Sequence, residues 1–320
     1  MKRLLASVIL ITMFGIIFCA SGSAGSVPDD GFGILFEQDD SMKNIYSLIA
    51  VRSDAPFKDA DGSAVSGVEI NVGGADAMIN WFLSAEGRRA ASEYGEDKYG
   101  EPLFFLLENA PESTAEIPQA TDETRVIRIS TTTSVNDSGL LGYLLPIFER
   151  EYGYRAEVHS AGTGKAIADA KLGNADLLLV HSEQQEEEFV KAGFARVVNG
   201  FKTERLSWLY NYFVLCGPGS DPAGVRQCRT VKDAFAAIAK GGHHFISRGD
   251  GSGTHTKEVS LWPAELGITT EADSVKKYSD WYTYSNAGMG VCLNMARETG
   301  GYILSDKATF LAFRSRSVDD

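Results

Sequence analysis

Short apolar runs alternate with amphipathic stretches over most of the chain after residue 125. The strand-like runs lie at 126–129, 155–159 and 177–180, and the helix-like stretches between them lie at 140–152 and 165–172. Buried strands that alternate with amphipathic helices are typical of parallel βαβ units. The pattern therefore predicts an α/β fold for this part of the chain.

A second series follows the first. Strands are predicted at 212–216, 245–247 and 302–304, and helices at 231–240, 254–261 and 290–299. Ahead of both series, the pattern predicts strands at 33–36 and 45–51 and a helix at 75–94. Two series of this size favour two α/β lobes, because about 300 residues suit two ordinary domains better than one.

Residues 108–124 interrupt this pattern. The segment is rich in Glu, Pro, Thr and Ala and has almost no apolar residues, which is typical of a linker. We expect it to be exposed and mobile, with a sequence that can be varied freely.

The N-terminus predicts export. Lys2 and Arg3 precede an apolar run at 4–18, and small residues at 21–24 offer a cleavage site, so residues 1–24 have the pattern of a secretory signal peptide. The expected compartment is the periplasm. Cys19 suggests lipidation as an alternative, but Phe18 stands where a lipoprotein signal requires a small residue.

Charge and cysteine content exclude several functions. The net charge of -13 argues against nucleic acid and against anionic membrane surfaces, because both require a basic face. Cys216, Cys228 and Cys292 have no metal-ligand or redox spacing, so buried thiols are expected, with one disulfide as an alternative. The charge also opposes an anionic ligand, which would need a few local donors in a preorganised site.

Hydroxyl groups and glycines concentrate where three predicted strands give way to helices. We call these the first, second and third junctions, and they lie at 130–134, 160–164 and 247–255. Free backbone N–H groups at helix N-termini bind anions, and ligands of open α/β sheets lie at the carboxyl ends of strands. In the third junction Arg248 adds a forked cationic donor. A helix cap is the simpler explanation for each junction alone, but three together favour an anion site.

Other motifs fail on inspection. His159 and Ala166 stand where a P-loop requires glycine and Ser/Thr, and Asp250 and Thr254 occupy the glycine positions of a nucleophile elbow. His243 and His244 are adjacent and so point apart, which disfavours a shared metal site. His255 could act as a general base, but no carboxylate is placed to orient it.

Seven ordered segments carry a family resemblance. They include "STTTSVNDSGLLGYLL" at 130–145, "SAGTGKAI" at 160–167, "ADLLLVHS" at 175–182 and "FISRGDGSGTHTKE" at 245–258. The chain closely resembles the tungstate-binding proteins of ABC uptake systems, the TupA family. The resemblance implies a type II periplasmic-binding-protein fold whose two α/β lobes close on an oxyanion. The ligand residues that it implies are Thr131, Thr132, Thr133, Ser134, Thr163, Arg248, Ser252 and Thr254.

The resemblance also implies a function. We expect a monomeric, non-catalytic receptor without a cofactor that delivers tungstate or molybdate to an ABC-transporter permease in the inner membrane. Sulfate and phosphate binding are the alternatives, and a periplasmic hydrolase of phosphate or sulfate esters that uses His255 is a further one. Hydrogen phosphate would reward a carboxylate acceptor such as Asp250, whereas tungstate rewards donors only.

The order of the segments departs from the family. Residues 43–106 resemble the family's C-terminal segment, yet here they precede its N-terminal segment. This resembles a circular permutation, with residues 108–124 joining the former termini. It predicts one lobe from 43–212 and a second from 213–320 together with 26–42.

Overall fold

The computed structural model describes residues 31–37, 39–59 and 61–316. The predicted signal peptide at 1–24 and Cys19 lie outside the described residues, as do 26–30 and 317–320 of the predicted second lobe.

The described strands are β1 (Phe32–Phe36), β2 (Lys43–Val51), β3 (Phe105–Leu106), β4 (Val126–Thr132), β5 (Arg155–Ala161), β6 (Leu177–Val180), β7 (Ala195–Arg196), β8 (Arg205–Pro218), β9 (Phe245–Ser247), β10 (Tyr282–Tyr284) and β11 (Ile303–Asp306). The α-helices are α1 (Val72–Phe82), α2 (Ala85–Glu93), α3 (Glu96–Tyr99), α4 (Thr133–Asp137), α5 (Leu140–Tyr152), α6 (Thr163–Lys171), α7 (Glu183–Lys191), α8 (Val231–Gly241), α9 (Gly253–Leu261), α10 (Ala272–Val275), α11 (Met289–Thr299) and α12 (Lys307–Arg316).

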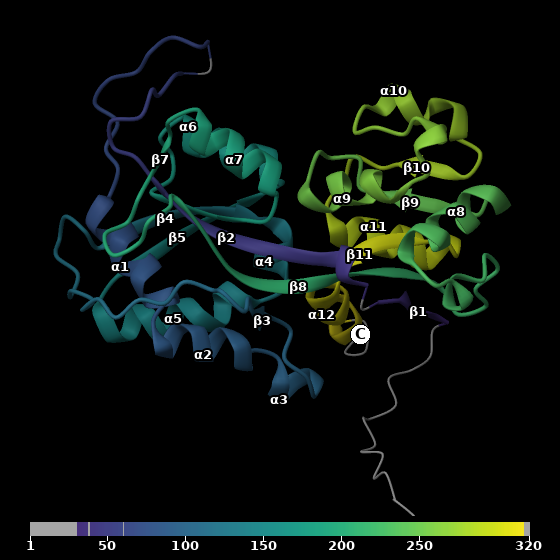
Figure 1. The fold of residues 1–320 in the computed structure, drawn as a ribbon, viewed down its shortest axis with the longest axis horizontal. Helices are drawn as coiled ribbons and strands as arrows, with labels where there is room; N and C mark the ends of the chain where they lie inside the picture. Colours follow the sequence, from purple (N-terminus) through teal and green to yellow (C-terminus); the bar gives the residue numbers. More distant parts are fainter. Residues whose placement is uncertain (1–30, 38, 60, 317–320) are drawn as a thin grey trace, which may run out of the picture.

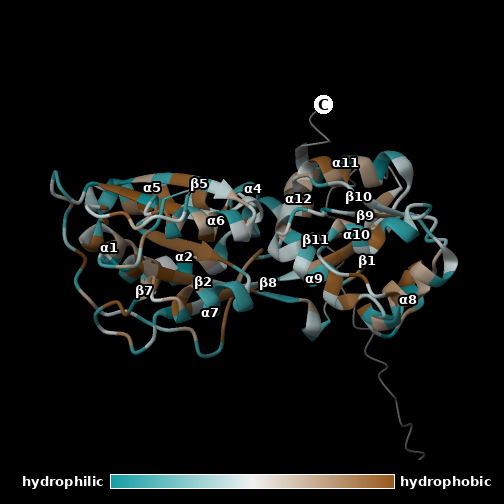
Figure 2. Ribbon diagram, turned by 90° about the horizontal axis from the view of Figure 1, so that it is seen from above, coloured by the Kyte–Doolittle hydropathy of each residue, from teal (hydrophilic) through white to brown (hydrophobic). Residues whose placement is uncertain are grey.

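One sheet runs through the molecule in the order β1-β8-β2-β6-β4-β5. Its longest described strand, β8, has 14 residues and crosses between two groups of elements, α1 to α7 on one side and α8 to α11 on the other (Figures 1 and 2). Within the first group, β4 is parallel to β5 and to β6, as the alternating pattern predicts. β2 is antiparallel to both β6 and β8. The predicted α/β class is confirmed.

In the strands of the first group, successive side chains pack alternately in two different hydrophobic clusters. Leu48 and Ala50 pack in one cluster with helices α1, α2 and α5, whereas Ile49 and Val51 pack in another with α6 and α7. Because side chains of a strand point alternately to opposite faces, this half of the sheet is buried on both sides. That arrangement explains why its strands are nearly continuous apolar runs.

The second group contains both antiparallel and parallel strand pairs. On β8, Phe213 and Val214 face different clusters, and both β1 and β11 pair with β8 antiparallel. β9 and β10 are parallel in a two-stranded sheet, and Phe245 of β9 also forms an isolated parallel bridge with Tyr302, which directly precedes β11. The sequence predicted strands and helices for this series but not their direction, because apolar runs alone do not specify strand direction.

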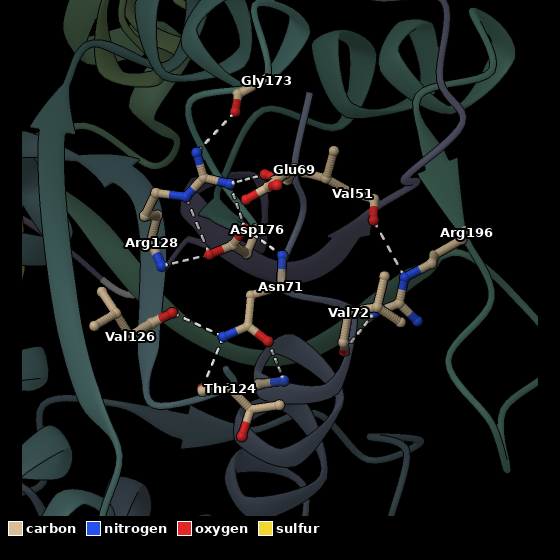
Figure 3. A network of polar contacts seen from close by, with 11 residues as sticks. Val51, Glu69, Asn71, Val72, Thr124, Val126, Arg128, Gly173, Asp176 and Arg196 are labelled. Atoms are coloured by element: carbon tan, nitrogen blue, oxygen red, sulfur yellow. Dashed lines mark hydrogen bonds and ion pairs between the residues drawn. The ribbon is translucent and has the colours of Figure 1, made fainter. Parts of the chain in front are cut away.

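A polar network holds the loop before α1 against the start of β4 (Figure 3). Asp176 is fully buried, and its Oδ1 accepts hydrogen bonds from Arg128 Nη2 at 2.6 Å and from Asn71 N at 2.9 Å. Asn71 Nδ2 donates to Val126 O at 2.7 Å. These contacts set where β4 begins and so help to place its carboxyl end.

One local prediction was wrong. The single helix expected at 75–94 is two helices, because Ser84 caps α2 and a Cβ on Gly87 would lie 2.1 Å from Trp81 O. The segment 108–124 has no regular structure and is mostly exposed, as expected, but it also makes specific contacts with the rest of the fold. Ser113 is buried, its N–H donates to Leu83 O at 2.9 Å, and Ala120 N donates to Tyr152 O at 2.8 Å.

The described cysteines and helices add two facts. Cys216 and Cys292 are buried, Cys228 is half-buried, and all three are free thiols. Among the helices of residues 31–316, none combines the length and apolar character needed to cross a membrane.

Candidate functional site

The three junctions meet in space, although the third belongs to the other side of the molecule from the first two. Thr132 at the end of β4 pairs with Ala161 at the end of β5, so the first and second junctions share one sheet edge. Arg248 Nη2 donates to Thr133 Oγ1 at 3.3 Å. A Cβ on Gly162 would lie 3.8 Å from Ser252 Cβ, so the second and third junctions are in contact range.

In the first junction the hydroxyl groups differ in whether their proton is still available for a ligand. Thr131 Oγ1 donates to Leu179 O at 2.6 Å inside the sheet, so its proton is already used and Thr131 is not placed as a hydroxyl donor to a ligand. Thr132 Oγ1 caps α4 by accepting from Val135 N at 3.3 Å, and it lies 3.0 Å from Ser134 Oγ. Thr133 is the residue that Arg248 reaches.

The second junction contributes Thr163 at the first turn of α6. This residue is fully buried, and its hydroxyl has no hydrogen-bond partner among the described residues. Gly162, the residue before it, provides no side-chain cap for the helix. The N-terminus of α6 therefore presents backbone N–H groups and one uncommitted hydroxyl.

The third junction places a charged group against the first. Arg248 is 3% exposed, and its Nη2 forms an ion pair with Asp250 Oδ2. Asp250 Oδ1 accepts from Ser252 N at 3.1 Å, so both carboxylate oxygens are engaged within the loop. Gly249 has a φ of +61°, and a Cβ there would lie 2.6 Å from the Tyr284 ring, which explains the glycine.

Two further hydroxyls of this junction lie at the start of α9. Ser252 Oγ caps the helix by accepting from His255 N at 3.3 Å, which leaves the serine proton available. Thr254 is buried, and its hydroxyl has no hydrogen-bond partner in the described part of the chain.

Unpartnered buried polar atoms concentrate in this region. In the described ranges they include Arg248 Nε, Thr163 Oγ1, Thr254 Oγ1, His181 Nδ1 and His255 Nε2. Buried polar groups are nearly always hydrogen-bonded, and leaving one unpaired costs about 1–3 kcal/mol. Arg248 Nε and the hydroxyls of Thr163 and Thr254 are donors without protein acceptors, which suits a ligand that only accepts hydrogen bonds.

The two histidines near the site are neutral at physiological pH. Burial and the positive charge of Arg248 lower the pKa of His181 to about 3. Burial likewise lowers the pKa of His255, whose Nδ1 accepts from Gly251 N at 3.1 Å. His255 thus holds the glycine loop, which fits a supporting role better than that of a general base oriented by a carboxylate.

His181 is the residue that the sequence analysis missed. It directly follows β6, and its Nε2 lies 2.8 Å from Ser134 Oγ. A signal for it exists in the sequence, because His181 and Ser182 form a further polar junction after the buried strand Leu177–Val180. As for metals, no group of three or more His, Cys, Asp or Glu side chains within the described ranges could hold an ion.

Comparison with known families gives an assignment for most of this chain. Residues 118–319 match the model of the PBP superfamily domain. This chain belongs to the PBP superfamily. The match starts inside the 108–124 segment, so β2 and α1 of this PBP-superfamily chain lie outside it.

Curated relatives are also similar. The chain is 43% identical over 208 residues to the tungstate-binding protein TupA of Peptoclostridium acidaminophilum, which covers 64% of this chain and 66% of the relative. It is 35% identical to the TupA of Campylobacter jejuni over 57% of this chain and 62% of that one. A putative ABC transporter anion-binding protein of Haloferax volcanii is 41% identical over 59% of this chain and 51% of the relative. The chain thus spans about half to two thirds of the relatives' lengths.

Among solved structures, that of a tungstate ABC transporter from Geobacter sulfurreducens is 39% identical, with a TM-score of 0.49 over 59% of this chain and 75% of that one.

Proposed function

We propose that this chain is an extracytoplasmic solute-binding protein that captures tungstate and delivers it to an ABC-transporter permease. The single observation that carries the proposal is the contact between Arg248 and Thr133, which brings a buried cation of one half of the molecule onto the hydroxyl-rich junction of the other. The similarity to TupA proteins supports tungstate as the anion.

The chemistry of the site favours an oxyanion without protons. Arg248, Thr163 and Thr254 offer donors, whereas both oxygens of Asp250, the nearby carboxylate, are engaged by Arg248 and by Ser252 N. A hydrogen phosphate would need a free acceptor for its proton, and tungstate does not. Molybdate has the same acceptor-only character and nearly the same size, so it is the main alternative ligand, ahead of sulfate and phosphate.

The proposed ligand groups are Thr132, Thr133, Ser134, Thr163, Arg248, Ser252 and Thr254, together with the N-termini of α6 and α9. Thr131 is assigned to the sheet because its hydroxyl donates to Leu179 O. We infer a monomeric receptor without catalytic activity, exported to the periplasm by the segment 1–24.

Calorimetric titration with tungstate, molybdate, sulfate and phosphate tests the ligand. We expect tungstate and molybdate to bind in preference to the other two, and preferential binding of sulfate or phosphate would contradict the assignment. Arg248→Ala should weaken binding by about 2–5 kcal/mol, because it removes a buried charged donor. The matched variant Thr163→Val removes one hydroxyl and should cost less, about 1–2 kcal/mol.

A hydrolase would behave differently in the same preparation. Turnover of phosphate or sulfate esters that disappears in His255→Ala would replace the receptor proposal with an enzymatic one.

We also infer that residues 43–212 and 213–320 with 26–42 are two lobes of a permuted chain. The support is that β1 pairs with β8 at Pro218, and that the Phe32 and Phe310 rings lie 6.1 Å apart. β2 likewise packs in one cluster with β4, although only β4 falls inside the family match. Deleting residues 26–42 should destabilise the second lobe, and unchanged unfolding of that lobe would contradict this division.

A further inference from the structure

His181 is wedged between the two halves of the molecule. His181 is only 7% exposed. The centroid of its ring lies 5.1 Å from the ring centroid of Tyr46 and 6.3 Å from that of Phe213. A Cβ on Gly253, the first residue of α9, would lie 2.8 Å from His181 Cε1. The imidazole therefore contacts the start of α9 while it remains attached to the end of β6.

A short chain of polar atoms links this imidazole to the first junction. His181 Nε2 lies 2.8 Å from Ser134 Oγ, and Ser134 Oγ lies 3.0 Å from Thr132 Oγ1. Ser134 is 1% exposed, so bulk water does not compete for its hydroxyl. A serine hydroxyl has one proton and two lone pairs. That single proton can serve His181, Thr132 or a bound anion, but only one of them at a time.

The position of the imidazole proton decides which of these it serves. With the proton on Nδ1, Nε2 is an acceptor, and Ser134 Oγ donates its hydrogen bond to it. The serine would then have only lone pairs to present to an anion. With the proton on Nε2, His181 donates to Ser134 and leaves the serine proton free for an acceptor-only ligand. An oxyanion site gains a donor only in the second case.

Two observations favour the second case. Nδ1 makes no hydrogen bond to another described residue, and a buried N–H without an acceptor is rarer in proteins than an acceptor without a donor. In addition, burial and the charge of Arg248 lower the pKa of His181 to about 3, so the ring carries only one proton near neutral pH. Ser134 Oγ, next to Nε2, is then the hydrogen-bond partner that another described residue offers this proton.

We propose that His181 is a positioning residue that donates from Nε2 to Ser134 and thereby directs the Ser134 hydroxyl proton toward the bound oxyanion. This inference rests on the proposed function, because it requires Ser134 to be a ligand of the anion. It adds a residue outside the three junctions to the determinants of affinity.

Two substitutions separate the donor from the packing. His181→Gln places an amide N–H near the position of Nε2, whereas His181→Phe fills the space without a donor. In titrations with sodium tungstate, His181→Phe should bind about ten-fold more weakly, the equivalent of one hydrogen bond, and His181→Gln should stay within about three-fold of the unsubstituted protein. Equal losses in both variants would overturn the proposal.

A double-mutant cycle with Ser134→Ala measures whether the effect of His181 on tungstate affinity depends on Ser134. A purely structural role of His181 would not produce such a dependence. If His181 acts through Ser134, then His181→Phe should cause no further loss of tungstate affinity in the Ser134→Ala background. The same ten-fold loss in both backgrounds would overturn the proposal, because it would mean that His181 contributes by packing alone.

The tautomer can be measured directly. Nitrogen-15 NMR of the unsubstituted protein should show the His181 proton on Nε2, and a proton on Nδ1 in the tungstate-bound protein would overturn the proposal even if His181→Phe fails to fold. The proposed function is tested separately. If tungstate binds and Arg248→Ala weakens it while His181→Phe does not, only the role of His181 fails; if no oxyanion binds, both proposals fail.

Discussion

Glu258 offers a quantitative test of how the third junction is supported. This carboxyl is 2% exposed in α9, and it accepts hydrogen bonds from Trp262 Nε1 at 2.8 Å, from Tyr282 OH at 2.7 Å and from Ser247 Oγ. Burial raises its pKa to about 7, although the three hydrogen bonds act in the opposite direction. Because Ser247 precedes Arg248, Glu258 supports the strand end next to the guanidinium that we propose binds the anion.

The raised pKa makes stability depend on pH with a definite sign. Below its unfolded value of 4.5 the group is protonated in both states, so it contributes no cost. Between 4.5 and about 7 the unfolded chain releases the proton while the folded chain keeps it, so the free energy of unfolding falls as pH rises. A shift of about 2.5 units at about 1.4 kcal/mol each corresponds to a loss of about 3 kcal/mol by neutral pH.

Glu258→Gln should remove this loss. The amide oxygen can accept from Trp262 and Tyr282, and the amide nitrogen can donate to Ser247 Oγ, so the hydrogen bonds survive without a buried charge. We expect the variant to be more stable than the unsubstituted protein above about pH 7 by up to about 3 kcal/mol, and the two to converge near pH 4.5.

Urea unfolding of both proteins from about pH 4 to about pH 9 measures the difference. Glu265→Gln removes the same charge at an exposed position and is the matched control. A stability difference between Glu258→Gln and the unsubstituted protein that does not change with pH would refute the assignment of a raised pKa to this carboxyl.

Three further substitutions test other parts of the structure. Gly253→Ala should lower tungstate affinity by about 1–3 kcal/mol, because the added Cβ would lie 2.8 Å from His181 Cε1 where the two halves meet. A Cβ added at Gly288 meets open space, so Gly288→Ala is the control and should bind tungstate normally in the same titration. Asp306→Ala should lower the free energy of unfolding, measured in urea, by about 3–5 kcal/mol. The substitution removes the carboxylate that accepts from four buried donors, those of Tyr46, Asn44, Asn211 and Thr309. A loss near zero would mean that water reaches this cluster. Ser113→Ala should lower the free energy of unfolding by about 1 kcal/mol, because it removes the hydrogen bond to Asn80. Thr114→Ala, at an exposed position, should have no measurable effect in calorimetric unfolding. Equal effects of the two substitutions would support a linker whose sequence can be varied freely.

Local signals in the sequence were sufficient for most strands and helices. The apolar run Leu177–Val180 predicts β6 within its observed bounds, and the amphipathic stretch Leu140–Tyr152 predicts α5 equally well. Such elements are set by burial pattern and by neighbours within a few residues. The junction at 247–255 was also visible, because Gly249 and Gly251 require positive φ and Ser252 caps the next helix.

Contacts between distant residues decided the rest. The antiparallel direction of β1 and β11 follows from pairing with β8, which no single segment encodes. The break between α1 and α2 depends on how closely Gly87 approaches the Trp81 carbonyl.

The site shows the same division between local and distant effects. Its hydroxyl and glycine residues were evident from composition, yet only the fold shows that the Thr131 proton goes to Leu179 O, 48 residues away, and that His181 contacts Ser134, 47 residues away. A hydroxyl can donate once, and its partner is whichever acceptor the packed chain brings within reach. Residue type therefore determined which chemistry was possible at each junction, and tertiary packing determined which hydroxyls remain free for a ligand.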